Sequence, residues 1–371
     1  MRRVPFVVAL VLLSGTVHAG GVEAVTYGEP VVDATEYPEV VEIASYDGST
    51  GEYFSVCTGT LISQTEVLTA AHCVRNKDHL LVNVGALGVD DWNPVGVVAS
   101  WYSGRYSQAK FANDIGLLRL VRDAGVTRVA KLAKSFSPKR STKYVLAGYG
   151  YDQNEDERGL LAAVLVPQDK AAARYFGKSF NPRTTLGAGR YIRGEGVYSG
   201  ACNGDSGGPL FVKGASLPRA VVGVVSYGAV GCNERAPTVF SRVSYYLPTI
   251  TSGRKYLSAR AAEPLAPLVL TAEKVTGSYR PQVKLTATTA TGRFIRSFCI
   301  KVDGVAVTSS VATGDVDLIP YAPEDGCFYN DDSFDLSGGV VSFTSSTAAR
   351  TVEITVMDEL RRTAVTSLTL P

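Results

Sequence analysis

Residues 203–210 read Asn-Gly-Asp-Ser-Gly-Gly-Pro-Leu, which places one hydroxyl among three glycines and a proline. Glycines let the backbone turn sharply and approach another molecule closely. The amide N–H groups of Gly204 and Ser206 are therefore predicted to converge on one point, where they could hold an oxyanion. A surface turn rich in glycine and serine is the competing interpretation. Because a serine hydroxyl is a weak nucleophile by itself, the first interpretation requires a general base elsewhere in the chain.

Histidine is scarce enough to restrict the choice of that base. The chain has three histidines, and His18 lies in an amino-terminal segment that we expect to be removed. His79 ends a polar run that indicates an exposed turn. His72 follows two alanines and precedes Cys73, which indicates a tight, disulfide-held turn after a strand-like segment. A histidine in a β protein is more often structural, yet imidazole acid–base chemistry in the mature chain would fall to His72.

Asp114 is the acid that best fits a partnership with His72. It precedes the apolar, strand-like run 115–120. A carboxylate carried into a protein interior without a partner is costly, so Asp114 should accept a hydrogen bond, and the ring N–H of His72 is suitable. Asp78 and the pair at 90–91 lie in polar loops and are predicted to be solvated.

Three segments thus share one order along the chain: Thr-Ala-Ala-His-Cys at 69–73, Asp-Ile-Gly-Leu-Leu-Arg-Leu at 114–120 and Gly-Asp-Ser-Gly-Gly-Pro-Leu at 204–210. Together they resemble the three catalytic segments of the trypsin/chymotrypsin family of serine proteases, and the resemblance covers about residues 25–257. It implies an all-β fold of two six-stranded β-barrels packed together, with the active site in the cleft between them.

The resemblance also implies a role for each residue of a serine endopeptidase. Ser206 would be the nucleophile, His72 the general base, and Asp114 the residue that orients the imidazole. The amides of Gly204 and Ser206 would form the oxyanion hole. The segment Ser226-Tyr227-Gly228 resembles the one whose backbone pairs with substrate as an added strand, and Ser226 would also help to hold Asp114.

The resemblance also implies a specificity pocket, whose residues are found by their distance along the sequence from the catalytic motifs. Gly200 would lie at its base, and Gly228 and Thr238 on its sides. Trypsin-like members carry an aspartate at the base, whereas Gly200 offers no charge to a substrate Lys or Arg. Desolvating that cation without a partner is costly, so cleavage after basic residues should be poor. Gly228 leaves the entrance open and Thr238 narrows the interior. The pocket is therefore expected to prefer small to medium uncharged residues, in the manner of elastases.

The amino terminus indicates export. Two arginines precede an apolar run, and Val17-His18-Ala19 has the small-x-small pattern that signal peptidase cleaves. A membrane anchor is the competing interpretation, but the run is shorter than the ~20 apolar residues that a spanning helix needs. We expect residues 1–19 to be a signal peptide and the protein to be secreted, either extracellular or periplasmic.

Members of the family commonly begin their mature chain with Ile or Val followed by Val-Gly-Gly, whose new ammonium pairs with the acid preceding the nucleophile. Residues 25–28 read Val-Thr-Tyr-Gly and are the best, partial match. The resemblance therefore implies an activation pair of Val25 and Asp205. It also implies a zymogen with a short propeptide at 20–24.

A second domain is expected after the protease domain, which we place at 25–258 with one helix over about 243–257. The stretch 259–267 is rich in Ala and Pro and indicates a linker. Residues 268–371 again alternate apolar and polar residues, and Asp303-Gly304 between two such runs indicates a hairpin. This part resembles, more weakly, the immunoglobulin-like β-sandwiches appended to secreted hydrolases.

Six cysteines in an exported chain favour three disulfides. Fifteen pairings are possible in principle, and pairing of sequence neighbours would give three short loops. The protease resemblance implies Cys57–Cys73 and Cys202–Cys232, which leaves Cys299–Cys327 for the second domain. No CxxC or HxxxH spacing supports a metal site, and we expect neither a metal nor a cofactor.

Composition restricts the partners. The 371-residue chain has a formal charge of +2, and its Lys and Arg residues are scattered with no basic block interleaved with aromatics. We therefore expect no nucleic-acid partner, and no membrane partner once the signal peptide is removed. The expected partners are protein or peptide substrates and protein protease inhibitors. Two alternatives are a catalytically silent binding protein on the protease fold and an adhesion module carried by the second domain.

Overall fold

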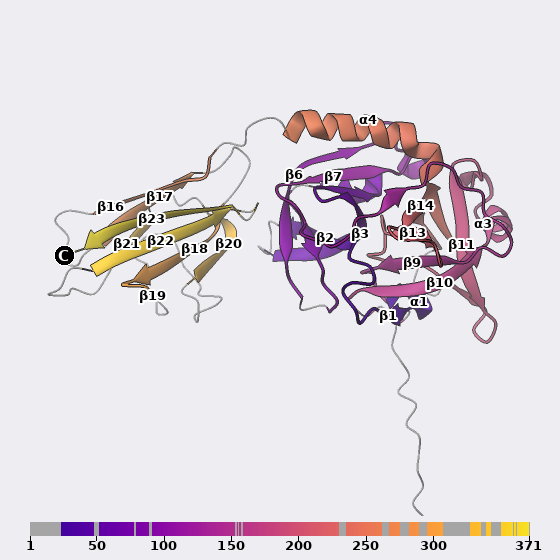
Figure 1. Ribbon diagram of the computed structural model, residues 1–371, viewed down its shortest axis with the longest axis horizontal. Coiled ribbons are helices and arrows are strands. Elements are labelled where there is room, and N and C mark those ends of the chain that lie inside the picture. Colours follow the sequence, from indigo (N-terminus) through magenta and orange to yellow (C-terminus); the bar gives the residue numbers. More distant parts are fainter. Residues whose placement is uncertain are drawn as a thin grey trace, which may run out of the picture.

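A computed structural model gives the arrangement in Figure 1. It describes residues 24–47, 52–77, 79–88, 91–152, 154, 156, 159–229, 235–261, 267–274, 282–288, 295–306, 327–334, 339–342, 350–358, 360 and 362–370. The expected signal peptide and all but the last residue of the expected propeptide lie outside this set. Among the described residues, no helix is long and apolar enough to cross a membrane.

Six antiparallel strands close the first barrel in the order β2-β3-β4-β7-β6-β5. Their bounds are β2 Val40–Asp47, β3 Glu52–Ser63, β4 Glu66–Thr69, β5 Leu80–Val84, β6 Pro94–Tyr102 and β7 Gly116–Leu120. Leucine and β-branched side chains, which suit a pleated surface, fill the interior. Strand β4 pairs with β7 so that Thr69 lies opposite Gly116. This register brings the segment just after β4 beside the segment just before β7.

The second barrel has the order β9-β13-β14-β15-β11-β10, and the ring closes where β10 pairs with β11. Its strands are β9 Tyr144–Gly148, β10 Leu161–Pro167, β11 Thr185–Ile192, β13 Pro209–Val212, β14 Ala220–Tyr227 and β15 Thr238–Arg242. Three short strands extend the sheet, namely β1 Glu29–Pro30, β8 Lys131–Leu132 and β12 Val197–Ser199. Two closed six-stranded barrels confirm this part of the predicted fold.

Helices are few. They are α1 Ala24–Tyr27, α2 Ala71–Val74, α3 Asp169–Phe176 and α4 Val243–Ala261, with 3-10 turns η1 Gln108–Lys110 and η2 Gly177–Ser179. Helix α4 runs along the first barrel in Figure 1. A Cβ at Gly253 of this helix would overlap the ring of Trp101, so a glycine is needed where the helix crosses β6. Arg254 donates to the buried Glu66 carboxylate at 2.6 Å and holds the helix to β4.

The predicted helix over 243–257 is confirmed and is longer than expected. It continues to Ala261, into the stretch predicted as a linker. Alanine has the highest helix propensity, and the added turn contains Ala259 and Ala261, which accounts for the extension. Residues 262–266, the centre of the predicted linker, lie outside the described residues.

The C-terminal part forms two sheets. One is β16-β17-β21 and the other is β19-β18-β22-β23, with β20 also paired to β18. The strands are β16 Val269–Lys274, β17 Gln282–Thr288, β18 Ile295–Val302, β19 Val305–Ala306, β20 Cys327–Phe334, β21 Gly339–Ser342, β22 Arg350–Asp358 and β23 Thr363–Leu370. Both sheets contribute to one apolar core. The Asp303-Gly304 hairpin is confirmed, because both residues have positive φ and Val302 pairs with Val305. The immunoglobulin-like assignment stays a prediction.

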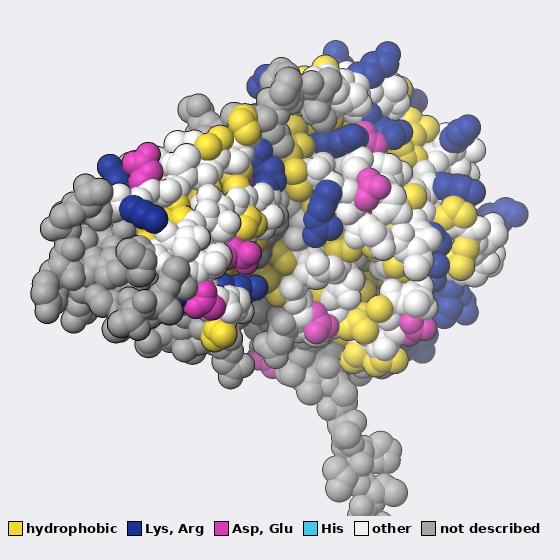
Figure 2. All heavy atoms as spheres, turned by 60° about the vertical axis from the view of Figure 1, so that its left-hand side comes forward, with side chains coloured by type: hydrophobic (Ala, Val, Ile, Leu, Met, Phe, Trp, Pro, Cys, Tyr) yellow, Lys and Arg dark blue, Asp and Glu magenta, His cyan; other side chains and the backbone are white. Residues whose placement is uncertain are grey.

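This C-terminal unit packs on the first barrel (Figure 2). Leu360, in the turn between β22 and β23, is only 1% exposed, and its Cα would lie 2.6 Å from a Cβ added to Gly96 of β6. Asp358 and Arg362 bracket the turn with a side-chain ion pair at 2.7 Å. A side chain at position 96 would collide with the turn around Leu360, so the glycine allows this turn to lie directly against β6.

Candidate active site

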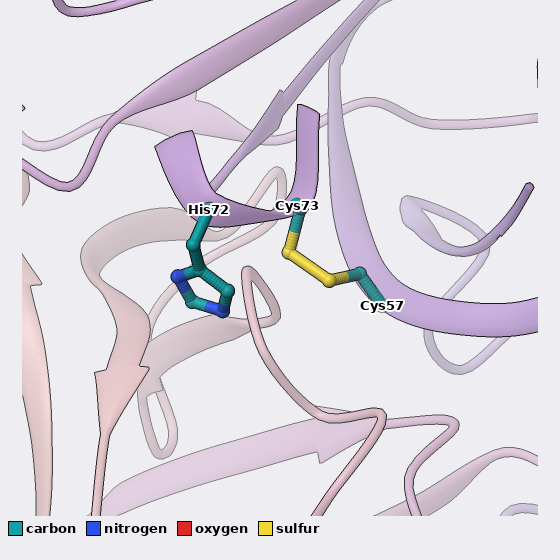
Figure 3. Close-up of side chains that lie close together, drawn as sticks. All are labelled: Cys57, His72 and Cys73. Atoms are coloured by element: carbon teal, nitrogen blue, oxygen red, sulfur yellow. A yellow bond between two sulfur atoms is a disulfide. The ribbon is translucent and has the colours of Figure 1, made fainter. Parts of the chain in front are cut away.

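His72 lies in α2, the single helical turn that follows β4 (Figure 3). The neighbouring Cys73 is joined to Cys57 of β3 by a disulfide, as predicted, so the turn is held against that strand. The imidazole remains 30% exposed. The backbone of His72 is thus constrained while the imidazole stays accessible, which is what a positioned acid–base group requires.

Asp114 is almost completely buried and receives several hydrogen bonds. His72 Nδ1 lies 2.8 Å from Asp114 Oδ2, and the His72 backbone amide donates to Oδ1 at 3.1 Å. Ser226 Oγ donates to Oδ2 at 2.7 Å, as the family resemblance implied. Ser241 Oγ also holds the segment by donating to the Asp114 carbonyl at 3.0 Å. A buried carboxylate with these donors keeps the proton of His72 on Nδ1 and leaves Nε2 as a base.

The loop that carries Ser206 is shaped by glycine. Gly204 and Gly207 have φ of +92° and +82°, a region that residues with a Cβ rarely adopt. The Ser206 carbonyl accepts from the Thr58 amide at 2.8 Å, and the Gly207 amide donates to the Val225 carbonyl at 2.9 Å. One bond anchors the loop to the first barrel and the other to the second. Ser206 is therefore located at the junction of the two barrels.

Two backbone amides in this loop are available to a ligand. Neither the Gly204 nor the Ser206 amide donates a hydrogen bond to any residue that the structure describes. The Ser206 hydroxyl likewise makes no hydrogen bond within the described chain, and hydrogen bonds to a reacting group often tighten only when substrate is present. Amides without acceptors beside a hydroxyl are what an oxyanion hole needs.

Asp205 is fully buried beneath the same loop. The Cys202 amide donates to its Oδ2 at 2.8 Å, and the Gly150 amide donates to Oδ1 at 2.9 Å. Burial raises the pKa of Asp205 to about 7, although these two backbone hydrogen bonds act in the opposite direction. Val25 is also fully buried, in the core of the second barrel. Its φ of +46° is unfavourable for a β-branched residue.

The residues expected at the base of the pocket are held by two threonine hydroxyls. Thr26 Oγ1 accepts from the Gly200 amide at 2.8 Å and donates to the Gly200 carbonyl at 3.2 Å. Thr238 Oγ1 accepts from the Ala201 amide at 2.8 Å. Gly200 and Thr238 are buried, whereas Gly228 is exposed at the end of β14. The contact of Thr26 with Gly200 could not be predicted from the sequence, because no local pattern relates the two residues.

Three aromatic rings form a row around Tyr227, the middle residue of the segment Ser226-Tyr227-Gly228. Tyr227 stacks on Phe111 with ring centroids 4.7 Å apart, and Phe176 meets the other side of Tyr227 edge-on at 5.1 Å. The Tyr227 hydroxyl donates to the Ser179 carbonyl at 2.7 Å. Phe111 is exposed and was not singled out from the sequence, although an apolar ring three residues before Asp114 in a polar stretch was an available signal.

The other cysteines agree with the predicted disulfides as far as the structure describes them. Cys299–Cys327 is formed, and Cys202 is disulfide-bonded, while its predicted partner Cys232 lies outside the described residues. Cys57, His72 and Cys73 have potential ligand atoms within 4.8 Å of one another. Both sulfur atoms belong to the disulfide in Figure 3, so this cluster offers no thiolate to a metal.

Comparison with known proteins agrees with this geometry. The trypsin family model matches residues 31–250. The chain is 32% identical over 241 residues to serine protease Hayan of Drosophila melanogaster, covering 59% of this chain and only 37% of Hayan. It is 30% identical over 255 residues to chymase of Rattus norvegicus, covering 65% of this chain and 94% of the chymase.

Two further relatives extend the comparison. Chymotrypsin-like elastase family member 1 of Bos taurus is 32% identical over 246 residues, covering 61% of this chain and 88% of the relative. Among solved structures, neuropsin, a serine protease expressed in the limbic system of mouse brain, superposes with a TM-score of 0.50 at 23% identity, covering 61% of this chain and 98% of neuropsin. The family match spans more than half of the chain, so this protein belongs to the trypsin family and is a serine endopeptidase.

Proposed function

We propose that the protein cleaves peptide bonds through an acyl-enzyme on Ser206, with His72 as general base and Asp114 as the residue that orients it. The observation that carries this proposal is the 2.8 Å contact between His72 Nδ1 and the buried Asp114. The two amides without acceptors beside Ser206 support it. A catalytically silent binding protein would have no need of either feature.

In the proposed reaction, Ser206 Oγ attacks the carbonyl carbon of the scissile peptide and its proton passes to His72 Nε2. The carbonyl oxygen becomes an oxyanion and accepts hydrogen bonds from the Gly204 and Ser206 amides. The C–N bond then breaks as His72 returns the proton to the leaving amine. Water then attacks the acyl carbon while giving a proton to His72 Nε2. The bond between the acyl carbon and Ser206 Oγ breaks, His72 returns the proton to Oγ, and the carboxylic acid product is released.

A fluorophosphonate probe tests the proposal directly, because it phosphonylates only an activated serine. We expect one labelled peptide, the one that contains Ser206, after incubation of the processed protein. Ser206→Ala should remove the label, whereas Ser199→Ala, which changes another buried serine of the second barrel, should retain it. Full labelling of the Ser206→Ala protein would assign the nucleophile elsewhere.

We further propose that cleavage follows small to medium uncharged residues. Gly200 brings no carboxylate to the pocket base, and Ala201 and Thr238 beside it are also uncharged. The similarity to a chymotrypsin-like elastase supports this preference. Large aromatic residues are the competitor, because they too are uncharged and would enter a wider pocket. The side chain of Thr238 decides between them, because it occupies space that a large ring would need.

This specificity predicts the outcome of a peptide-library experiment. Cleavage should be strongest after Ala, Val, Leu or Met, with differences of about 10- to 200-fold among apolar residues. Thr238→Gly should raise cleavage after Phe and Tyr relative to Ala. The matched control is Thr238→Ser, which keeps the hydroxyl that accepts from the Ala201 amide and should retain the original profile. A profile dominated by Arg and Lys would contradict the proposal.

Secretion and processing complete the proposed function. The signal-peptide pattern at 1–19 supports export, and the disulfides are of the kind found in oxidising compartments. Removal of residues 20–24 would free the amino group of Val25, which the family resemblance pairs with the buried Asp205. The left-handed φ of Val25 supports processing at this point, because cleavage of the preceding peptide bond releases the strain.

A further inference from the structure

The formal charge of +2 conceals a strong division of charge within the protease domain. Acidic residues outnumber basic ones by about two to one between residues 25 and 123. The ratio is reversed, again by about two to one, between residues 124 and 243, which contain the second barrel. In Figure 2, dark blue basic side chains predominate along the edge of the molecule farthest from the C-terminal unit. Charge asymmetry of this kind points to an anionic partner rather than to the fold.

Two segments of this barrel carry basic residues with no acid among them. Every charged residue between Ala124 and Tyr151 is basic, and the same is true between Ser206 and Asn233. Six of these side chains are exposed, and we call them the basic surface: Lys131, Lys134, Lys139, Arg140, Lys143 and Lys213. No block is visible along the sequence because the residues come from separate segments. The structure brings the two segments side by side.

Backbone hydrogen bonds show how the segments meet. The Lys213 amide donates to the Lys143 carbonyl at 2.8 Å, where β9 and β13 pair. The Lys131 amide donates to the Arg219 carbonyl at 2.8 Å, where β8 pairs with β14. A turn closed by the Thr142 amide and the Lys139 carbonyl at 2.9 Å adds two more basic residues next to Lys143.

The basic surface is not neutralised by the rest of the described protein. Among the described residues, no ion pair joins any of its six members to an acid. Arg128 and Arg219, from the same two segments, behave differently, because both pair with the buried Glu39 and serve the fold. Like charges that face each other at the end of a strand pair, such as Lys143 just before β9 and Lys213 just after β13, are unfavourable. The fold does not require this arrangement, which points to a binding role.

The composition of the surface indicates the kind of partner. Five of its six members are lysines, which act as point charges and suit repeated sulfate or carboxylate groups. Among the described residues of the two segments, no aromatic side chain is exposed, so nucleic-acid bases would find no stacking platform. In the described part of these segments Leu217 is the one large apolar side chain that is exposed, which is too little for membrane insertion. A linear anionic polysaccharide satisfies these conditions.

The position of the surface keeps it away from the active site. Strand β13 begins three residues after Ser206 and carries the chain about 13 Å farther before Lys213, at ~3.3 Å per residue. A polymer bound there would leave the site open. We propose that the basic surface binds a linear sulfated or carboxylated polysaccharide, which anchors the protease without blocking its active site.

Salt-gradient elution from immobilised heparin, a sulfated polysaccharide, tests this inference on the full chain. The test variant is Lys139→Ser/Arg140→Ser/Lys143→Ser/Lys213→Ser. The control, Lys255→Ser/Lys274→Ser/Lys284→Ser/Lys301→Ser, removes the same charge from exposed positions of α4 and the C-terminal unit. Wild type and control should elute together, and the test variant at markedly lower salt, with affinity at physiological salt reduced by more than about ten-fold.

Other outcomes would overturn the proposal. If the two variants lost equal amounts of heparin affinity, the effect would be one of net charge alone. If wild type were not retained on the heparin column, the basic surface would be excluded as a site for a sulfated polysaccharide. Tighter binding to duplex DNA or to vesicles containing phosphatidylserine than to heparin would assign a different partner. Fluorophosphonate labelling of Ser206 should be the same in all three proteins, which separates failure of this inference from failure of the proposed catalytic function.

Discussion

Asp114→Asn is expected to lower kcat/KM for a peptide substrate by about 10⁴-fold while the protein stays folded. The Asp114 carboxylate accepts from His72 at both Nδ1 and the backbone amide, and also from Ser226. An asparagine can satisfy the backbone amide with its oxygen, but its NH₂ group then faces Nδ1. The imidazole would adopt the tautomer protonated at Nε2, which cannot accept the proton of Ser206.

The control for this prediction is Ser226→Ala, which removes one donor to Asp114 but leaves the contact with His72 intact. A hydrogen bond to a charged group contributes about 1.5–3 kcal/mol, so the loss of rate should be about 10- to 100-fold. Steady-state kinetics give both effects, and thermal unfolding shows whether each variant is folded. An Asp114→Asn protein that is folded and within ten-fold of wild type would show that Asp114 does not set the tautomer.

The unprocessed chain is expected to lose about 4 kcal/mol of stability as the pH rises from about 4 to about 7, because of Asp205. Burial raises the pKa of this carboxyl from 3.8 to about 7. Between these values the folded chain keeps a proton on Asp205 that the unfolded chain has released. Stability therefore falls with rising pH across this window and is constant above it.

Processing should remove this loss. If the new ammonium of Val25 pairs with Asp205 as proposed, it favours the ionised carboxylate and lowers the pKa of Asp205, so that the charged form is no longer penalised. Urea unfolding at several pH values would compare the unprocessed chain with the chain that begins at Val25. Both should carry Ser206→Ala to prevent self-cleavage. The fall in the free energy of unfolding between about pH 4 and about pH 7 should be present in the unprocessed chain and absent in the chain that begins at Val25.

Asp205→Asn provides the matched control, because it cannot ionise. In the unprocessed chain it should flatten the pH dependence attributed to Asp205. In the processed enzyme with Ser206 intact it should lower kcat/KM by at least about 100-fold, since the loop that presents the Gly204 and Ser206 amides would lose its anchor. Amino-terminal sequencing of fully active enzyme that begins at Gly20 would contradict the whole activation scheme.

The features that sequence alone identified correctly have short-range causes. Turn chemistry marked the Asp303-Gly304 hairpin, because a two-residue turn needs positive φ at both positions. The spacing of apolar residues predicted α4, although the helix ends at Ala261, four residues after the expected end at 257. The three motif segments indicated the barrel pair, and the predicted disulfide of Cys57 and Cys73 is formed.

Other features depend on how the closed barrels bring distant strands together. Ser226 donates to Asp114 across the barrel junction, Thr26 holds Gly200, and Phe111 stacks on Tyr227. The lysines of the basic surface meet only because β9 pairs with β13 and β8 with β14. Sequence by itself therefore determined the family and the candidate catalytic residues, since these follow from motifs of a few residues, and the family resemblance implied the two barrels. The tertiary structure decided which side chains support them and where charge gathers, because strand register and barrel closure are set by hydrogen bonds between residues far apart in the chain.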